Sequence, residues 1–243
     1  MKIFTYWEGQ PNIIAVTCVK SISRVFGSDH LHLTPETLRS FITLPRNILE
    51  TPHLGFRTDY IRAALLLKYG GWWFDSDIFL LANPSKTINL SHPALWTENK
   101  KDIFGRPNIC NAVLYSPANS PYLNKVIENF TAVKTIPTLW TAGQEIFSKV
   151  AYDATNFNIQ IFDHSYFYPI LPEYWPDIWA ASHNETKLKY GIHMYLSKIQ
   201  RKKHAPKLAE QITEIGTLNN LLDLFPKSLF TLVYKSTSLF EKA

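Results

Sequence analysis

The sequence has only two cysteines, Cys18 and Cys110, among 243 residues. This number excludes the disulfide framework of a small secreted domain and favours a reducing compartment in which both thiols are buried. The sequence also lacks a run of about 18 apolar residues, which excludes a conventional membrane-spanning helix. Because Glu8 and Gly9 interrupt the short apolar stretch that follows Lys2, we expect no secretory signal peptide. These absences predict a cytoplasmic protein.

Internal repeats and low-complexity linkers are absent as well, so one large domain is the expected organisation. Apolar residues make up 46% of the chain and aromatic residues 14%, which is typical of a globular protein with a substantial core. The formal charge of +5 is concentrated late in the chain, around Arg201–His204. This cluster is compatible with a solvated face, an anionic membrane surface or the phosphates of a substrate. We expect no nucleic-acid partner.

Strand-like and helical segments alternate along the chain, which predicts an α/β fold with a mainly parallel sheet. We expect strands at residues 2–6, 30–33, 72–74, 78–81, 94–96, 109–115, 157–162 and 192–196. We expect helices at residues 11–26, 58–68, 121–133 and 143–150, and again from residue 205 onward. Thr58 is the predicted N-cap of the second helix, and Gly70 with Gly71 is its predicted stop.

The most informative stretch is W-W-F-D-S-D, in which Asp75 and Asp77 follow an aromatic strand. If the strand were regular, the two carboxylates would project from the same side. Two neighbouring anions are costly without a cation, and carboxylate oxygens are preferred ligands of Mg²⁺ and Mn²⁺. In open α/β sheets, ligands bind beyond the carboxyl ends of strands, where this pair is expected.

The preceding helix adds further polar groups. Asp59 and Arg62 are three residues apart and therefore share a helix face. Alone, a D-x-D pattern is most often a capping or solvated segment. Together with Asp59, Arg62 and the double glycine, it predicts a site for a divalent metal and a diphosphate.

The combination D-x-x-R, G-G and W-W-F-D-S-D resembles the DXD glycosyltransferases of the GT-A fold, and family 32 in particular. That family includes bacterial capsule and lipopolysaccharide sugar transferases, the animal α-1,4-galactosyltransferases and the yeast initiating mannosyltransferase. The resemblance implies a single Rossmann-like domain with a mixed, mainly parallel central sheet flanked by helices. It covers residues 1–200, the expected catalytic domain; residues 201–243 would form a basic and apolar helical C-terminal extension.

The resemblance also implies roles at the donor. Asp59, Arg62 and Asp77 would be the catalytic set. Asp59 would bind hydroxyls of the donor sugar, Arg62 would face the sugar or the diphosphate, and Asp77 would bind the metal directly. Asp75 would contact the ribose and the metal shell. Two further donor-site residues are implied, Trp7, which would stack on the nucleotide base, and Asn111, which would lie near the donor sugar.

The acceptor side and the closing segment are implied less fully. Thr141, Gly143 and Gln144 fall where relatives carry a turn that lines the acceptor side. His193 matches a late histidine that can complete the metal shell, here Mn²⁺ or Mg²⁺. Relatives often follow it with a Ser-Trp pair, whereas Ser197 and Lys198 follow here. Trp7 as a core aromatic, Asn111 as a turn residue and His193 as a structural histidine remain alternatives.

The implied reaction is transfer of a sugar, with retention, from a nucleotide diphosphate donor to a hydroxyl of a glycan or glycolipid. A UDP-sugar is the favoured donor. No carboxylate is placed as a nucleophile, so a front-face mechanism is preferred, and Glu145 is a remote candidate for a base. The alternatives are a metal-dependent phosphohydrolase or nucleotidyltransferase, and an inactive protein that only binds nucleotide sugars.

The last residues give one expectation about location. The basic cluster precedes apolar helical segments with Leu229, Phe230, Leu232, Val233, Leu239 and Phe240. A helix of this kind can lie on the inner face of a membrane, where lipid-linked acceptors are found. It can equally pack on the domain. Peripheral membrane association is therefore a hypothesis, and so is the role of Tyr166, Tyr168 and Trp175 as a sugar platform.

Overall fold

The structure is a computed structural model. It describes residues 1–10, 12–101, 105–133, 142–153, 157–170, 172–180, 188–200, 205–215, 217–225 and 227–238. The chain forms two compact units: the first contains residues 1–8, 26–75 and 84–164, and the second contains residues 9–25, 76–83 and 165–243. Each unit is therefore assembled from segments that are far apart in the sequence. The division of the chain at residue 200 remains a prediction.

The first unit is built on one six-stranded sheet. Its strands are β1 (Ile3–Tyr6), β2 (His30–Leu33), β3 (Gly71–Phe74), β5 (Ala94–Lys101), β6 (Pro107–Ser116) and β7 (Gln160–Phe162), in the order β2-β1-β3-β6-β5-β7. Only β6 runs antiparallel to its neighbours; the other pairings of the sheet are parallel. The predicted mixed, mainly parallel sheet is confirmed.

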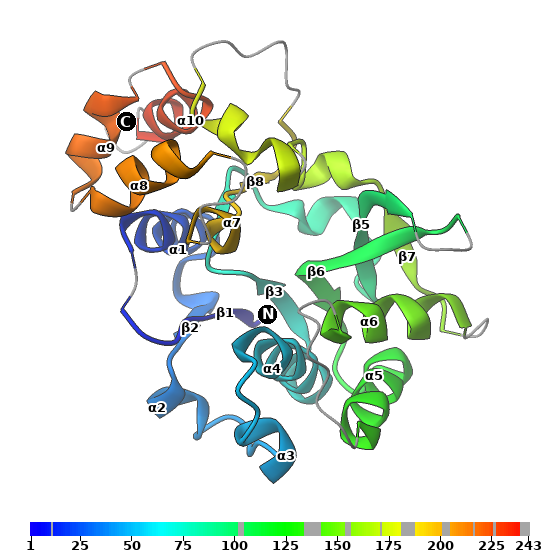
Figure 1. Ribbon diagram of the computed structural model, residues 1–243. Helices are drawn as coiled ribbons and strands as arrows, with labels where there is room; N and C mark the ends of the chain where they lie inside the picture. Colours follow the sequence, from blue (N-terminus) through cyan, green and yellow to red (C-terminus); the bar gives the residue numbers. More distant parts are fainter. Residues whose placement is uncertain are drawn as a thin grey trace. The chain divides into compact units, whose positions relative to one another are not determined.

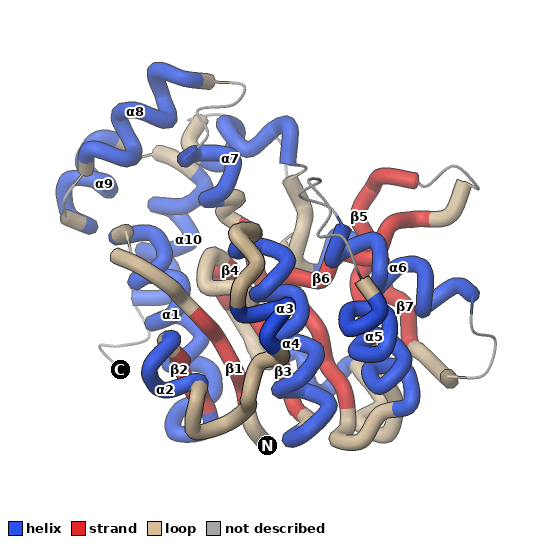
Figure 2. Tube along the Cα trace, turned by 60° about the horizontal axis from the view of Figure 1, so that its bottom comes forward, coloured by secondary structure: helices blue, strands red, loops and turns tan. Residues whose placement is uncertain are grey.

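Helices of the first unit pack on this sheet or on one another. They are α2 (Pro35–Leu38), α3 (Arg46–Leu49), α4 (Leu54–Tyr69), α5 (Pro121–Ala132) and α6 (Ala142–Asp153). Helices α4, α5 and α6 lie side by side, and α4 and α6 contact the strands (Figure 1, Figure 2). The buried core between them includes Phe4, Trp73, Leu114, Phe130 and Phe147. The layer of helices on a sheet is the α/β arrangement that the sequence predicts.

Helix α4 begins earlier than its sequence suggests. Its N-cap is His53, and the hydroxyl of Thr58 lies inside the helix, where it donates to the carbonyl of Leu54 at 2.9 Å. The predicted N-cap at Thr58 is wrong because a threonine hydroxyl can bond backward to the preceding turn as well as cap. The predicted stop is confirmed: Gly70 adopts φ 64° and donates its N–H to Leu66 O. A left-handed backbone favours glycine at this end.

The second unit contains helices and a two-stranded antiparallel sheet. The elements are α1 (Ile13–Phe26), β4 (Ile78–Leu80), β8 (Gly191–His193), α7 (Leu196–Gln200), α8 (Pro206–Glu214), α9 (Leu218–Leu224) and α10 (Leu229–Ser238). In the two-stranded sheet, Ile78 pairs with His193. The predicted helical C-terminal region is confirmed.

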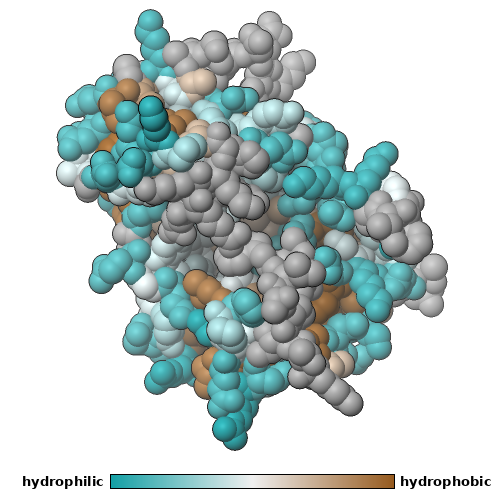
Figure 3. All heavy atoms as spheres, in the orientation of Figure 1, coloured by the Kyte–Doolittle hydropathy of each residue, from teal (hydrophilic) through white to brown (hydrophobic). Residues whose placement is uncertain are grey.

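Helix α10 packs within the second unit through its apolar side chains. Leu229 and Phe230 are buried, and the ring of Phe230 lies 5.7 Å from that of Phe79 in β4 and 5.3 Å from that of Trp179. Leu224 and Leu232 remain about half exposed, and apolar side chains reach the surface over the C-terminal helices (Figure 3). Among the helices in the described ranges, none is long and apolar enough to cross a membrane.

The two cysteines behave as the sequence predicts. Cys18, in α1, and Cys110, in β6, are both buried free thiols. Burial raises the pKa of Cys18 well above its usual value, and the charge of Asp77 adds to this effect. A thiol with a raised pKa is a poor nucleophile, which fits a packing role.

Candidate functional site

Asp75, Ser76 and Asp77 form the link between β3 and β4, and these strands belong to separate sheets. The backbone N–H of Asp75 donates to Ala112 O in β6 at 2.7 Å. The carbonyl of Asp77 accepts from Met194 N, just after β8, at 2.8 Å. The segment is therefore not a regular strand, and strand alternation does not set the directions of its carboxylates. Each aspartate is fixed by a different sheet.

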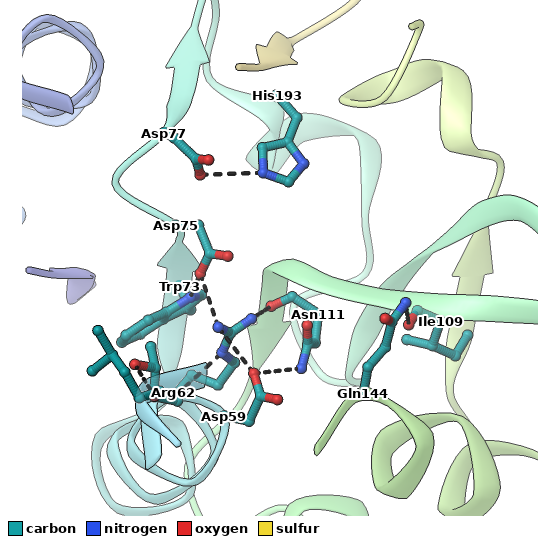
Figure 4. A network of polar contacts seen from close by, with 11 residues as sticks. Asp59, Arg62, Trp73, Asp75, Asp77, Ile109, Asn111, Gln144 and His193 are labelled. Carbon is teal, nitrogen blue, oxygen red and sulfur yellow. Dashed lines mark hydrogen bonds and ion pairs between the residues drawn. The ribbon is translucent and has the colours of Figure 1, made fainter. Parts of the chain in front are cut away.

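In the first unit, Arg62 is the centre of a buried polar cluster (Figure 4). Its Nη2 lies 3.1 Å from Oδ1 of Asp59 and 3.1 Å from Oδ1 of Asp75. Its Nη1 donates to the backbone carbonyl of Asn111. Only 4% of Arg62 is exposed. One guanidinium, whose fork of donors suits several oxygens at once, thus joins helix α4, the end of β3 and strand β6.

Asp59 has a strongly perturbed pKa. Oδ1 of Asp59 accepts a hydrogen bond of 2.9 Å from Nδ2 of Asn111. Burial raises the pKa of Asp59 to about 6, Asp75 contributes to the increase, and Arg62 and Asn111 oppose it. Near neutral pH the carboxyl therefore lies close to the point at which it exchanges a proton, as expected for a group in a functional site.

Asn111 reaches the cluster because strand β6 is irregular. In the pairing of β5 with β6, Leu95 lies opposite Leu114, but the next residue, Trp96, lies opposite Cys110. Residues 111–113 therefore bulge out of this pairing, while Val113 pairs with Phe74 of β3. Bulges re-aim side chains beside functional sites. The bulge places Asn111 beside Asp59.

Trp7 follows the carboxyl end of β1 and is half-buried. Its backbone N–H donates to Leu33 O at 3.0 Å. The indole Nε1 is shielded from solvent and meets no hydrogen-bond acceptor among the described residues. Trp7 is thus not a fully buried core aromatic.

A cavity of about 420 Å³ opens in the first unit beside the same strand end. It is lined by Tyr6, Glu8, Pro35, Leu38, Arg39, Ile42, Thr43, Leu44, Leu49 and Arg57. Glu8 accepts from Tyr6 at 2.9 Å and from Arg57 at 2.6 Å. The volume is in the range of small-molecule sites. No sequence motif marks this cavity, because its wall comes from four separate segments.

The start of α6 lies against Asp59. A Cβ added at Gly143 would lie 1.9 Å from Oδ2 of Asp59, so only glycine fits there. Nε2 of the neighbouring Gln144 donates to Ile109 O in β6 at 3.0 Å. Of the three residues predicted on the acceptor side, Gly143 and Gln144 thus join α6 to Asp59 and β6, and Thr141 lies outside the described residues.

In the second unit, Asp77 is held by the segment that includes and follows β8. Its Oδ1 lies 3.2 Å from Nε2 of His193, and its Oδ2 accepts from the N–H of Leu196 at 3.0 Å (Figure 4). Burial alone would raise the pKa of Asp77, but the attraction of His193 and these hydrogen bonds hold it below its usual value. Asp77 is therefore ionised at neutral pH, as a metal ligand must be.

The conformation of Tyr195 makes this grip on Asp77 possible. Tyr195 has φ 52°, a left-handed backbone that bulky residues rarely adopt. Its hydroxyl donates to Ile170 O at 2.6 Å, and its ring lies 4.2 Å from the ring of His193. Tyr168 packs against His193 from another direction, with ring centroids 5.7 Å apart. The turn at Tyr195 brings Leu196 N–H to Asp77, a role that no sequence motif marks.

The candidate sugar platform is mainly a packing cluster in this conformation. Tyr168 and Trp175 are buried, and Tyr166 stacks on Tyr190 with 5.8 Å between ring centroids. Trp73 belongs to the cluster although no sequence pattern predicts a role for it. Its buried indole contacts both Asp75 and Arg62. An aromatic residue in a strand usually indicates core packing, and its polar N–H was the only signal available.

The fold has known relatives among solved structures. A glycosyltransferase involved in the glycosylation of the major capsid of PBCV-1 has a TM-score of 0.52 and 16% identity, over 84% of this chain and 100% of that chain. The glycosyltransferase GlyE of Streptococcus pneumoniae TIGR4 has a TM-score of 0.50 and 13% identity, over 94% of this chain and 64% of that chain. At such identities the likeness concerns the fold, and it confirms the predicted GT-A type.

Sequence comparison gives the family. No curated protein matches the chain. The family model of the capsular polysaccharide synthesis proteins matches residues 1–133, more than half of the 243 residues. This family agrees with the predicted enzyme class, a glycosyltransferase, while the finer assignment to family 32 stays a prediction. The chain belongs to the capsular polysaccharide synthesis protein family.

Proposed function

We propose that the protein is a retaining glycosyltransferase that moves a sugar from a nucleotide diphosphate, preferably a UDP-sugar, to a hydroxyl of a glycan or glycolipid. The Arg62 cluster carries this proposal, because it brings together Asp59, Asp75 and Asn111 beside the end of β3. The family description supports a place in polysaccharide synthesis. The names of both fold relatives support sugar transfer.

Residues of the first unit would bind the donor sugar and base. Asp59 and Asn111 offer a carboxylate and an amide, which are suited to sugar hydroxyls. The indole of Trp7 would stack on the base, and its N–H has no acceptor among the described residues. Gly143 and Gln144 would lie toward the acceptor, and Thr141 is proposed with them. Retention without a covalent intermediate is proposed because no carboxylate is assigned as a nucleophile.

The charges of the Arg62 cluster support dependence on a metal ion. Arg62 is shared between Asp59 and Asp75, so the cluster has no net positive charge when Asp75 is ionised. A diphosphate would be repelled here unless another cation neutralised it. The internal guanidinium thus orders the carboxylates but does not by itself compensate the charge of a departing diphosphate.

Asp77 and His193 would hold this cation, with Asp75 two residues before Asp77 in the chain. Two carboxylates and an imidazole are a suitable donor set for Mn²⁺ or Mg²⁺, and the low pKa of Asp77 keeps that carboxylate ionised. When bound, the ion would act as a Lewis acid on the diphosphate oxygens. In the first unit, Arg62 would keep the carboxylates of Asp59 and Asp75 ordered.

An inner-membrane surface is the proposed location. Exposed Leu224 and Leu232 lie on the C-terminal helices, and the basic residues 201–204 are nearby in the sequence. The burial of Leu229 and Phe230 leaves less apolar surface than the sequence suggested. Binding would therefore depend mainly on charge. Sedimentation with anionic vesicles at low salt, and release at high salt, is the expected result; no binding at low salt would contradict it.

The proposed reaction is tested by incubating the protein with a panel of nucleotide sugars and Mn²⁺. We expect one donor, a UDP-sugar, to raise the melting temperature, and slow release of free UDP and sugar in the absence of an acceptor. Asp77→Ala should lose the metal-dependent release. Release of inorganic phosphate or pyrophosphate in place of UDP would contradict the proposal and indicate a phosphohydrolase or nucleotidyltransferase.

A further inference from the structure

Strand β3 carries two adjacent tryptophans that are both fully buried, Trp72 and Trp73. Strand alternation sends their side chains to opposite faces of the sheet. Trp72 packs among aromatic rings, including those of Trp96 and Tyr115, and its Nε1 donates to Ser85 Oγ at 3.1 Å. Trp73 faces helix α4 and belongs to the core beneath it. The two residues are alike in size and burial, but only one of them faces the Arg62 cluster.

Trp73 makes two polar contacts with that cluster. Its Nε1 donates to Oδ1 of Asp75 at 2.7 Å (Figure 4). Its ring lies 5.2 Å from Cζ of Arg62, a distance at which a guanidinium is attracted to an indole face. The same Oδ1 of Asp75 also lies 3.1 Å from Nη2 of Arg62. One indole therefore contacts both members of an ion pair.

These contacts restrict Asp75 more than packing alone would. The close-packed core fixes the indole ring of Trp73. Rotation of the Asp75 carboxylate would therefore break its hydrogen bond to the indole N–H. Two donors on one oxygen fix the position of that oxygen and thereby limit rotation of the carboxylate. Residues that orient ligands in this way affect binding at a site that they do not touch themselves.

We propose that Trp73 is a positioning residue for the donor site, which holds the carboxylate of Asp75 and the guanidinium of Arg62 in the orientation needed to bind a nucleotide diphosphate with its cation. This inference rests on the proposed function. Trp73 does not touch the donor in this role; it acts through Asp75 and Arg62. Trp72 is the matched control, since Trp72→Phe also removes a buried indole hydrogen bond from the same strand.

The test compares Trp73→Phe, Trp72→Phe, Asp75→Asn and the double variant Trp73→Phe with Asp75→Asn. Binding of UDP in the presence of Mn²⁺, and of Mn²⁺ alone, is measured by titration calorimetry. Unfolding in urea shows whether each variant is folded. We expect Trp73→Phe to weaken binding of Mn²⁺ with UDP about tenfold or more, and Trp72→Phe to leave it nearly unchanged at a similar loss of stability.

The double variant separates positioning from packing. If Trp73 acts through Asp75, Trp73→Phe weakens binding much less in the Asp75→Asn background than in the wild type, whereas independent effects would multiply. Multiplying losses, or equal losses for both tryptophans, would overturn the proposal. If the wild-type protein bound Mn²⁺ but not UDP, the proposed function would be contradicted. Mn²⁺ binding by the variants would then still test whether Trp73 positions Asp75. Binding of neither contradicts both.

Discussion

The Arg62 cluster of the first unit and the Asp77–His193 pair of the second unit hold carboxylates with different partners. Asp59 and Asp75 share a guanidinium that keeps its charge at every pH relevant to a protein. Asp77 is paired with an imidazole, whose charge depends on pH and whose nitrogen can bind a metal ion instead. Asp59 and Asp75 thus share a permanent internal cation, whereas the partner of Asp77 is a side chain that can bind a metal ion.

Within the motif Asp75-Ser76-Asp77, the first carboxylate is therefore part of a structural ion pair, and the second is free to exchange its partner for a metal ion. Removal of a permanent buried cation leaves its carboxylates uncompensated, so it should destabilise the fold. Removal of the Asp77 carboxylate should mainly abolish metal binding and should affect stability less. Four predictions test this distinction, in order of expected effect.

The largest effect is expected for Arg62→Met. The variant should lose about 3–5 kcal/mol of unfolding free energy, because a buried ion pair loses one partner, and all turnover should be lost with it. Urea unfolding and donor hydrolysis measure the two losses. Arg57→Met is the control, since its ion pair with Glu8 is more exposed and its loss should be clearly smaller. Equal losses would show that the Arg62 cluster has no special structural role.

Asp77→Asn should have the opposite balance. We expect metal-dependent turnover to fall at least about a hundredfold, as a lost metal contribution of several kcal/mol implies. The stability loss should be much smaller than that of Arg62→Met, because an amide oxygen can still accept from Leu196 N–H. Turnover is measured against Mn²⁺ concentration, alongside unfolding. If Asp77→Asn were unfolded, the ion pair of Asp77 and His193 would be structural, like the Arg62 cluster.

Gly143→Ala should disturb the Arg62 cluster from the side of α6. The new methyl group would meet Oδ2 of Asp59, and overpacking of this kind costs about 1–3 kcal/mol. The cost should shrink when Asp59→Ala is introduced as well, because Oδ2 and Cγ are then gone and only Cβ of residue 59, at 2.7 Å, remains close. Unfolding of both single variants and of the double variant measures this coupling. Additive losses would mean that α6 and Asp59 are independent.

The smallest effect concerns pH. The folded pKa of Asp59 is about 6, above the value of 3.8 for an unperturbed aspartate, so the folded state holds this proton more tightly than the unfolded state. Stability contributed by the protonated group is therefore complete below the unfolded pKa and is lost as pH rises through the folded pKa. Asp59→Asn should remove this decline between pH about 4 and 6. Urea midpoints that decline equally in both proteins would refute the assignment.

Local signals in the sequence predicted most of the fold and part of the site. The end of α4 at Gly70 could be predicted because it depends on a local property, the positive φ that glycine adopts easily. The start of the same helix was misjudged, since Thr58 has the side chain of an N-cap but uses it inside the helix. Helix ends that depend on a side chain with two possible partners are less certain than those that depend on glycine.

The site shows the same division between local and long-range information. The spacing of Asp59 and Arg62 predicts their contact within one helix. The contact of Arg62 with the carbonyl of Asn111, and that of Asp77 with Leu196, join residues that are far apart in the sequence. Such contacts depend on strand pairing, which a single sequence does not specify. For the same reason the roles of Trp73 and Tyr195 were not foreseen.

The bulge of β6 has a consequence for variation among relatives. Residues 111–113 are held by β3 and α4 and are not paired with β5. Changes in the length of β5, β7 or the hairpin that joins β5 to β6 can therefore be absorbed at the bulge without moving Asn111. The outer part of the sheet can therefore change in length while the geometry around Asp59 is preserved.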